Sequence, residues 1–309
     1  MAGIGGFITN AVITTEALTK FYGKRRGLDG LDMEVRSGEV YGFLGPNGAG
    51  KTTTIRLLLD VLRPTSGQAR VLDLDPRADG VRLRRRVGYL PGDFIVDGRQ
   101  DSRHLLDHLA ALRGGVDRHR IDELIDRFEL DADILIRSLS KGNRQKVGLI
   151  QAFMHQPELL ILDEPTSGLD PLMQREVHTL IGEAAEQGQT VFMSSHVLSE
   201  VQAIADRVGI IRDGRLAAVE DVETLRARAI RHVTISFNGH VPPGSFDSVQ
   251  GIEDVALENS TLRCTLTGWA DELIKAASRF EVVSIQSEEP DLEQMFFTFY
   301  EGGGGAHVA

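Results

Sequence analysis

Residues 39–62 read EVYGFLGPNGAGKTTTIRLLLDVL, and this stretch decides the fold. EVYGFL is an apolar run of strand length, whereas KTTTIRLLLDVL has helical periodicity and stops before Pro64 and Gly67. Between them, GPNGAGKT (residues 45–52) fits G-x-x-x-x-G-K-[ST] in the strand–loop–helix context that this motif needs. Glycines let such a loop wrap closely around a polyphosphate, and the N–H groups at the helix start attract it. The stretch therefore predicts a nucleoside triphosphate site.

Two side chains of this phosphate loop carry specific chemistry. The ammonium group of Lys51 would reach the β- and γ-phosphates, and the hydroxyl group of Thr52 would ligate Mg²⁺. The loop itself leaves the identity of the base open. The residues of the loop that we expect to bind the nucleotide are Gly45, Pro46, Asn47, Gly48, Ala49, Gly50, Lys51, Thr52 and Thr53.

A second apolar run ends in two adjacent carboxylates. Residues 159–164 read LLILDE, a buried strand followed at once by Asp163 and Glu164. Beside a phosphate loop, Asp163 would bind Mg²⁺ through a coordinated water, and Glu164 would polarise a water in line with the γ-phosphate. Without the loop upstream, the same pair would fit a solvated strand edge equally well.

Strand-length apolar runs alternate with helical patterns from about residue 11 to residue 215, which predicts an α/β fold. Residues 158–162 and 190–193 are short apolar runs typical of inner strands in a mostly parallel sheet. The stretch from about 92 to 155 is rich in helical patterns, and we interpret it as a helical subdomain. It would be inserted into a first domain of residues 1–225.

The remaining residues, 226–309, predict a small C-terminal α+β accessory domain with a flexible tail. Residues 230–309 carry four Lys or Arg against twelve Asp or Glu, and strand patterns occur at 233–237 and 261–266. Two helical patterns follow, at 269–280 and 290–300. Their apolar positions, expected to face a core, are Trp269, Leu273, Ala277, Leu292, Met295, Phe296 and Phe299.

Composition excludes several classes of protein. The 309 residues are 41% hydrophobic and 26% charged, which is ordinary for a folded protein and excludes disordered or fibrous chains. The formal net charge of −11 argues against nucleic-acid binding through bulk charge. A single cysteine, Cys264, leaves no internal disulfide and indicates a reducing compartment. No stretch has the roughly 20 apolar residues that a membrane-spanning helix needs.

Three further patterns follow the loop in a fixed order along the chain. Residues 139–145 read LSKGNRQ, residues 167–170 read SGLD, and Ser195-His196 follows an apolar strand. With the phosphate loop and the acidic pair, these resemble the motifs of the nucleotide-binding subunit of an ABC transporter. They would be the LSGGQ signature in the looser form L-S-x-G-x-x-Q, the D-loop and the switch histidine. The resemblance covers about residues 13–218.

This resemblance implies a P-loop NTPase core of the ABC ATPase type that works as a head-to-tail homodimer. Each ATP, with Mg²⁺ held by Thr52 and Asp163, would lie between the phosphate loop of one copy and the signature of the other. Glu164 would be the general base, His196 would hold the γ-phosphate and the attacking water in line, and Tyr22 would stack on adenine. The residues expected in trans are Ser140, Lys141, Gly142, Asn143 and Gln145, and those of the D-loop are Ser167, Gly168, Leu169 and Asp170.

The chain departs from the family pattern at the position of a glutamine and in the middle of the signature. Where the family has a glutamine after a strand, this chain has Gly92 followed by Asp93, and only the second has a side chain that could substitute. The signature carries Lys141 and Asn143 at its altered middle positions. Ser140 also fits a helix N-cap. The basic run of residues 82–86 fits a solvated helix face better than a partner surface.

The C-terminal region, ending in PDLEQMFFTFY, resembles the accessory domain of drug- and antibiotic-export ATPases that pair with an ABC-2 type permease. The resemblance therefore implies a separate integral membrane permease and a peripheral location at the cytoplasmic face of the plasma membrane. An importer ATPase, a soluble ABC ATPase without a transport partner and a regulatory module that barely hydrolyses ATP are the alternatives. A single phosphate loop and the acidic charge argue against members that act on ribosomes or DNA.

Overall fold

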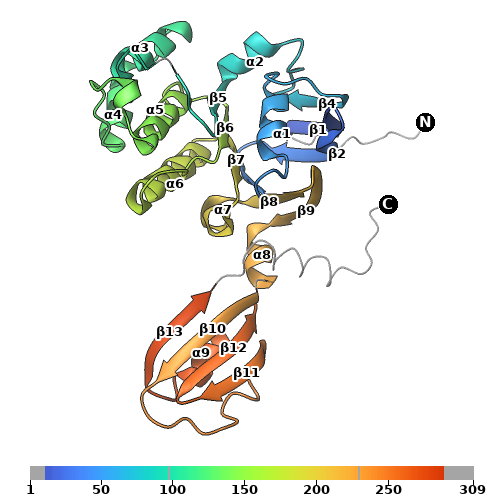
Figure 1. Ribbon diagram of the computed structural model, residues 1–309, viewed down its shortest axis with the longest axis vertical. Helices are drawn as coiled ribbons and strands as arrows, with labels where there is room; N and C mark the ends of the chain where they lie inside the picture. The colour runs from blue at the N-terminus through green and yellow to red at the C-terminus, as the bar shows by residue number, and fades with distance from the viewer. Residues whose placement is uncertain (1–10, 97, 229, 289–309) are drawn as a thin grey trace, which may run out of the picture. The chain divides into compact units, whose positions relative to one another are not determined.

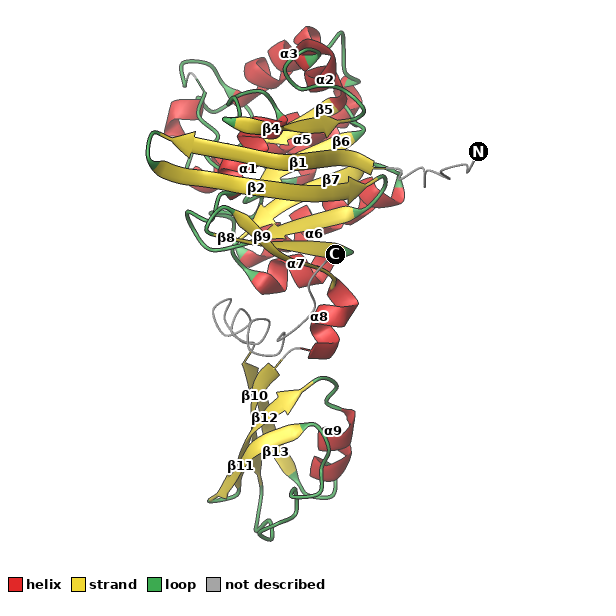
Figure 2. Ribbon diagram, turned by 90° about the vertical axis from the view of Figure 1, so that its right-hand side faces the viewer, coloured by secondary structure: helices red, strands yellow, loops and turns green. Residues whose placement is uncertain are grey.

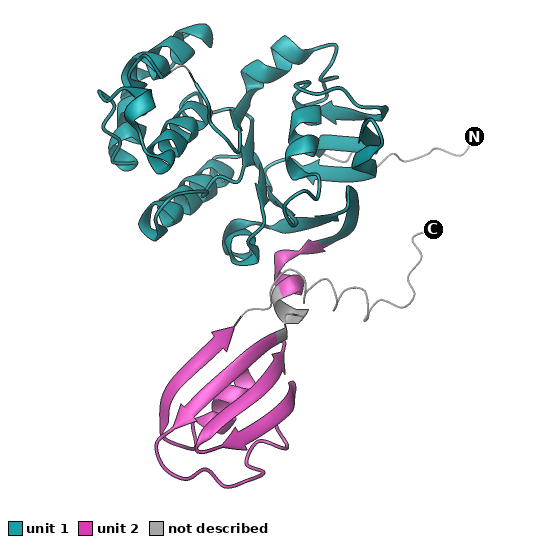
Figure 3. Ribbon diagram, in the orientation of Figure 1, with its two compact units in different colours: residues 1–219 teal, residues 220–309 magenta. Residues whose placement is uncertain are grey.

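The computed structural model describes residues 11–96, 98–228 and 230–288. The chain divides into two compact units, residues 1–219 and residues 220–309, which are described separately (Figure 3). In the described helices, no segment is long and apolar enough to cross a membrane.

A six-stranded sheet forms the centre of unit 1 (Figure 1), and its inner strands are parallel. In sheet order its strands are β5 (Val87–Leu90), β6 (Leu159–Asp163), β7 (Thr190–Ser195), β3 (Val40–Leu44), β8 (Arg207–Arg212) and β9 (Arg215–Asp221). Every residue of β3, β6 and β7 is buried, as expected for inner strands of a parallel sheet. Because these strands run in the same direction, the segments that follow them meet at one edge of the sheet.

A smaller antiparallel sheet lies beside the first (Figure 2). Its strands, in order, are β2 (Arg25–Arg36), β1 (Ala11–Tyr22) and β4 (Ser66–Val71). Helix α1 (Lys51–Leu58) contacts strands of both sheets, and one apolar cluster that includes Leu28, Ile55 and Phe192 joins them. The predicted end of this helix at Leu62 is wrong. The helix ends at Leu58 because Asp60 adopts a left-handed backbone with φ 53°.

Helices account for most of the stretch that was expected to form a helical subdomain (Figure 1). These are α3 (Ser102–Leu112), α4 (Arg118–Arg127), the short 3₁₀ helix η1 (Ile136–Ser138) and α5 (Lys141–Phe153). The other helices of unit 1 are α2 (Gly80–Arg86), α6 (Pro171–Glu186) and α7 (Leu198–Ile204). On α2, Arg82, Arg84 and Arg85 are exposed, whereas Arg86 forms a bidentate pair with Glu158, and the solvated face stays a prediction.

The described residues of unit 2 form a four-stranded antiparallel sheet and two helices. The strands, in sheet order, are β11 (Ile252–Glu258), β12 (Thr261–Thr267), β10 (Ile230–Phe237) and β13 (Val282–Glu288), and the helices are α8 (Val222–Arg228) and α9 (Asp271–Ala277). Buried residues of β10 and β12 pack against Leu273 and Ala277 of α9, as expected. The α+β class predicted for this region is therefore confirmed.

Two expectations for the C-terminal region have different outcomes. Trp269 was expected to face the core and is instead 76% exposed, so that prediction is wrong. The helix begins only at Asp271, and Gly268 turns the chain with φ 82°, which leaves Trp269 outside the helical register. The predicted helical pattern at 290–300, with Leu292, Met295, Phe296 and Phe299, lies outside the described residues.

Candidate functional site

The phosphate loop joins β3 to α1 in a conformation that only glycine adopts easily. Gly48 and Gly50 have φ values of 82° and 117°, and Gly50 is the N-cap residue of α1. A side chain at Gly45 would lie 2.4 Å from the carbonyl oxygen of Ile211. No side chain caps α1, so its first N–H groups are available to an anion. The loop therefore has the geometry that phosphate binding requires.

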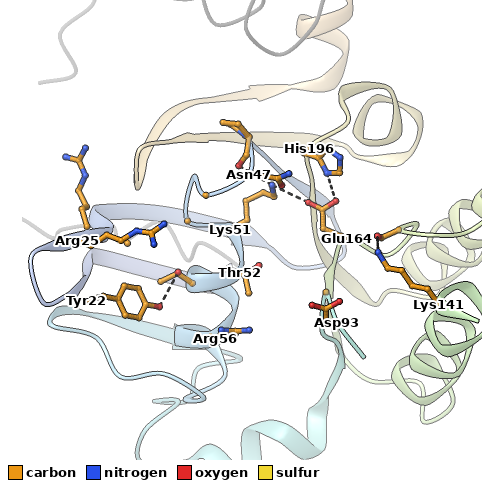
Figure 4. A pocket seen from close by; sticks show the side chains of 18 residues that line it. Tyr22, Arg25, Asn47, Lys51, Thr52, Arg56, Asp93, Lys141, Glu164 and His196 are labelled. Atoms are coloured by element: carbon orange, nitrogen blue, oxygen red, sulfur yellow. Dashed lines mark hydrogen bonds and ion pairs between the residues drawn. The ribbon is translucent and has the colours of Figure 1, made fainter. Parts of the chain in front are cut away.

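Lys51 is the cation of this loop and is 6% exposed. Its ammonium group donates to the carbonyl oxygen of Gly45 at 2.7 Å and lies 3.2 Å from Oε1 of Glu164 (Figure 4). The buried charge thus has both a hydrogen-bond acceptor and an anionic partner, as a buried ammonium needs. The pairing also brings the phosphate loop against the acidic pair.

Thr52 and Asp163 face each other as a metal site needs. The hydroxyl group of Thr52 donates to Oδ2 of Asp163 at 2.8 Å, and Asp163 is 1% exposed. The other oxygen of this carboxylate, Oδ1, accepts from Ser194 at 2.6 Å. Hydroxyl and carboxylate oxygens are ligands that Mg²⁺ prefers, with phosphates and water completing its octahedron. The residues present therefore fit Mg²⁺ bound together with a polyphosphate.

Glu164 is held in an uncommon backbone conformation. Its φ is 53°, and its N–H group donates to both the carbonyl and the hydroxyl oxygen of Ser194, at 3.3 and 3.1 Å. A side chain held this way at a strand end is pre-organised, at a conformational cost that the surrounding contacts must offset. Oε2 of Glu164 lies 2.6 Å from Nδ1 of His196, whose side chain is 48% exposed. Glu164 and His196 belong to separate sequence motifs, and the fold brings them into contact beside the phosphate loop.

A pocket of about 910 Å³ is lined by Lys51, Thr52, Glu164 and His196, among others (Figure 4). Tyr22 stands at one side of it, 46% exposed, with its hydroxyl group 3.4 Å from that of Thr53. A side chain at Gly27 would lie 2.8 Å from the Tyr22 ring, so this glycine leaves the ring its space. The stacking of Tyr22 on adenine stays a prediction. The lining residues are Tyr22, Arg25, Arg26, Gly27, Pro46, Asn47, Gly48, Gly50, Lys51, Thr52, Thr53, Arg56, Gly92, Asp93, Lys141, Glu164, Ser167 and His196.

The signature segment begins helix α5. Ser140 is its N-cap and accepts from the N–H group of Asn143 at 3.2 Å, which confirms the predicted cap. Gln145 is buried and donates to the carbonyl oxygens of Glu164 and Pro165, both at 3.1 Å. Its side chain therefore supports the turn that carries Glu164 in its own chain, a role that its place in the signature motif did not suggest. A contact of Gln145 in trans stays a prediction.

The D-loop packs against the signature of the same chain. The ammonium group of Lys141 lies 3.2 Å from the hydroxyl group of Ser167, and a side chain at Gly142 would come within 2.7 Å of the carbonyl oxygen of Gly168. Asp170 caps α6, and the N–H groups of Met173 and Leu172 lower the pKa of its carboxyl group. Leu169 is buried. Signature and D-loop thus form one continuous surface beside the pocket.

The position of the missing glutamine is crowded. A side chain at Gly92 would lie 3.2 Å from Oδ2 of Asp163, so this glycine brings the backbone close to the proposed metal ligand. Asp93 lines the pocket with an exposed side chain (Figure 4). Asp93 is therefore the residue of this pair whose side chain faces the site.

Sequence reasoning missed Ser194, which is fully buried and contacts both carboxylate-bearing residues. A partial signal was present, because two serines precede His196 at the end of a buried strand. The parallel register that sets Ser194 opposite Asp163 decides the contact, and that register is not visible in the sequence.

Comparison with known proteins gives consistent matches. The sequence model of the family described as "ABC transporter" matches residues 28–167. The chain is 40% identical over 228 residues to the bacitracin transport ATP-binding protein BcrA of Bacillus licheniformis, covering 71% of this chain and 72% of that protein. It is 32% identical over 308 residues to the bacitracin transport ATP-binding protein BcrA of Enterococcus faecalis, covering 96% and 99% of the two chains.

Solved structures with a similar fold include ATP-binding subunits of ABC transporters. The ATP-binding subunit of an ABC transporter matches with a TM-score of 0.64 at 27% identity, covering 70% of this chain and 92% of that one. A dimeric post-hydrolysis state of the ATP-binding cassette MJ0796, bound to ADP and Pi, matches with a TM-score of 0.63 at 21% identity. That match covers 68% of this chain and 98% of the cassette, and at this identity the likeness concerns the fold alone.

Proposed function

Because this chain belongs to the ABC transporter family, as an ATP-binding subunit that hydrolyses ATP, we propose that two copies close around two ATP molecules to power export through a separate membrane permease. The observation that carries this proposal is the convergence of Lys51, Asp163 and Glu164 on one phosphate loop, with His196 beside the base. Glu164 lies within hydrogen-bond distance of both Lys51 and His196, and Asp163 accepts a hydrogen bond from Thr52 of the loop.

In the proposed reaction, the loop N–H groups and Lys51 hold the β- and γ-phosphates. Glu164 accepts a proton from the water that attacks the γ-phosphorus, while the bond to the bridging oxygen breaks and ADP leaves. His196 orients the Glu164 carboxylate and the attacking water. Thr52 and Asp163 would hold Mg²⁺, which would supply positive charge beside the phosphate oxygens.

Dimerisation is supported by the position of the signature. Ser140 is exposed at the N-terminus of a 13-residue helix, an arrangement that attracts anions. Neither Ser140 nor Gly142 is among the described residues that line the pocket of their own chain. We propose that both contact the γ-phosphate bound to the other copy, with Lys141 and Asn143 completing that surface, Gln145 supporting it from within its own chain and the D-loop residues 167–170 facing across the dimer.

A pair of variants tests this arrangement. Glu164→Gln removes the proposed base and keeps the shape of the side chain, so it should bind ATP, hydrolyse it very slowly and form a stable dimer in gel filtration with ATP. Adding Ser140→Arg should return the protein to a monomer that still binds ATP. Wild-type turnover in Glu164→Gln would contradict the role of Glu164, and a dimer that survives Ser140→Arg would contradict the trans geometry.

Export of an antibiotic or a similar small amphipathic molecule is supported by the two relatives, whose names assign them to bacitracin transport. We propose that the subunit works at the cytoplasmic face of the plasma membrane, bound to an integral membrane permease and not to nucleic acid. Co-purification from membranes with an identified permease tests this. An importer permease in the complex would favour the import alternative, and the absence of any permease would favour a soluble ABC ATPase.

A further inference from the structure

Outside the residues assigned so far, one carboxylate connects the two segments that carry the proposed base and the histidine. Glu200 lies in the first turn of α7 and is half-buried. Its Oε1 accepts from the hydroxyl group of Thr166 at 2.6 Å, and its Oε2 accepts from the hydroxyl group of Ser195 at 2.7 Å. Thr166 and Ser195 are 3% and 0% exposed. Charge-assisted hydrogen bonds this short, to buried donors, are strong.

Each of these hydroxyl groups sits at a functional turn. Thr166 follows Glu164 by two positions, and its carbonyl oxygen accepts from the N–H group of Leu169 in the D-loop at 3.1 Å. Ser195 directly precedes His196, and its carbonyl oxygen accepts from the N–H group of Gly45 in the phosphate loop at 3.2 Å. Glu200 therefore connects the D-loop side of the site to its phosphate-loop side.

The hydrogen-bond directions favour a carboxylate at this place. The hydroxyl oxygen of Ser195 accepts from the N–H group of Val197 at 3.0 Å, and of the two acceptors within reach of its hydrogen, Glu200 at 2.7 Å is nearer than the carbonyl oxygen of Val197 at 3.3 Å. The two hydroxyl groups donate to different oxygens of Glu200, and an ionised carboxylate has an acceptor at both places. In a glutamine with the same orientation an NH₂ group replaces one of these oxygens, so one of the two contacts loses its acceptor.

We propose that Glu200 is a positioning residue for ATP hydrolysis, a clamp that holds His196 in line with Glu164. This inference rests on the roles proposed above for those two residues. The side chains of Glu164 and His196 are in contact with each other. Glu200 links the same two segments of the chain through neighbouring residues, Thr166 and Ser195. Without the clamp the side chains of Glu164 and His196 are free to separate. A misplacement of about 1 Å in an active site costs about 100-fold in rate.

The predicted effect falls on turnover and not on affinity. Lys51 and the N-terminus of α1, which bind the phosphates, form no hydrogen bond or ion pair with Glu200 in the part of the chain that the structure describes, so they keep their geometry when it is replaced. We therefore expect Glu200→Ala to lower kcat about 10- to 100-fold, with ATP affinity and KM within about 2-fold of wild type. Glu200→Gln keeps one acceptor and the side-chain volume, so its kcat should lie between those of wild type and Glu200→Ala.

The experiment measures kcat, KM and ATP affinity for Glu200→Ala and Glu200→Gln in the full chain. Glu186→Ala, at an exposed position of α6, is the matched control and should behave as wild type. In a background of Thr166→Val with Ser195→Ala, the clamp has no donors left, so Glu200→Ala should lower kcat by less than about 2-fold further. This loss of effect separates a clamp from a general contribution to stability.

Several outcomes would overturn the inference. These are a wild-type kcat in Glu200→Ala, a fall in ATP affinity equal to the fall in kcat, or an undiminished effect in the double-variant background. Because Glu200→Gln preserves packing, a full kcat in that variant combined with an unfolded Glu200→Ala would also count against it. Failure of the proposed function looks different, since Glu164→Gln would then keep its turnover whatever Glu200 does.

Discussion

The two units of this protein bury different kinds of side chain. In the part of the chain that the structure describes, every buried polar or charged residue lies in unit 1. They are Thr15, Glu39, Lys51, Thr54, Ser102, Gln145, Asp163, Thr166, Thr190, Ser194 and Ser195. The core of unit 2 is an apolar cluster from β10, β12 and α9, in which Cys264 is buried and burial raises the pKa of its thiol group.

This difference reflects the site around the phosphate loop of unit 1. Burying polar groups costs free energy unless each finds a partner, and the partners of Lys51, Gln145, Asp163, Thr166, Ser194 and Ser195 belong to one connected set around the phosphate loop. Unit 2 follows the simpler rule of an amphipathic sheet covered by a helix. Polar burial therefore identifies the functional part of the molecule without reference to any motif.

We expect the largest change in free energy from a cavity made in the core of unit 2. Leu262 is fully buried, so Leu262→Ala should destabilise that unit by about 2–5 kcal/mol, from lost burial and the cavity that remains. Urea unfolding followed by a probe in each unit measures it, with Thr261→Ala at a less buried neighbour as control. If the comparison holds, ATP binding by unit 1 is unchanged. An equal loss of ATP binding would show that the two units do not act independently.

The next effect concerns the buried charge of unit 1. Lys51→Ala removes a charge-assisted contact to the phosphates worth about 1.5–3 kcal/mol, which corresponds to a roughly 10- to 100-fold loss of ATP affinity. Equilibrium dialysis or calorimetry with MgATP measures it. Lys275→Ala, at an exposed lysine of unit 2 that pairs with Asp271, should leave the affinity unchanged. An unchanged affinity in Lys51→Ala would remove the phosphate-loop assignment.

The smallest effect concerns a half-buried histidine, His155, which is not among the residues that line the pocket. Burial and the neighbouring Arg113 guanidinium lower the pKa of His155 from 6.5 to about 4. Its Nε2 lies 2.8 Å from the Arg113 guanidinium, so it accepts that hydrogen bond only while the ring is neutral. The unfolded chain binds a proton at His155 near pH 6.5 and the folded chain only near pH 4.

Stability contributed by a neutral His155 should therefore be complete above about pH 6.5 and be lost as the pH falls toward about 4. We expect a loss of about 1 kcal/mol, because partial exposure of the ring weakens the effect. Thermal unfolding of unit 1 between these pH values measures it. The pH dependence should shrink in His155→Asn and stay as in wild type in His240→Asn, an exposed histidine of unit 2. Equal pH profiles for all three proteins would contradict the assignment.

Sequence patterns predicted much of the fold because the helices, strands and caps concerned depend on residues that are neighbours in sequence. The strand–loop–helix context of residues 39–58, the apolar strand before Asp163 and the cap at Ser140 all depend on neighbours in sequence, and the structure confirms them. The errors also have local causes. A left-handed Asp60 ended α1 early, and the turn at Gly268 moved Trp269 out of the helix.

The sequence alone thus predicted which residues we expect to carry the chemistry, because a phosphate loop, an acidic pair and a histidine are written as residue types at fixed spacings. Only the tertiary structure decided how they are held. The register of β6 against β7 sets Ser194 on Asp163, Gln145 supports the turn of Glu164, and Glu200 reaches two strand ends at once. Such contacts join residues that are distant along the chain, and they exist only after the parallel strands have paired.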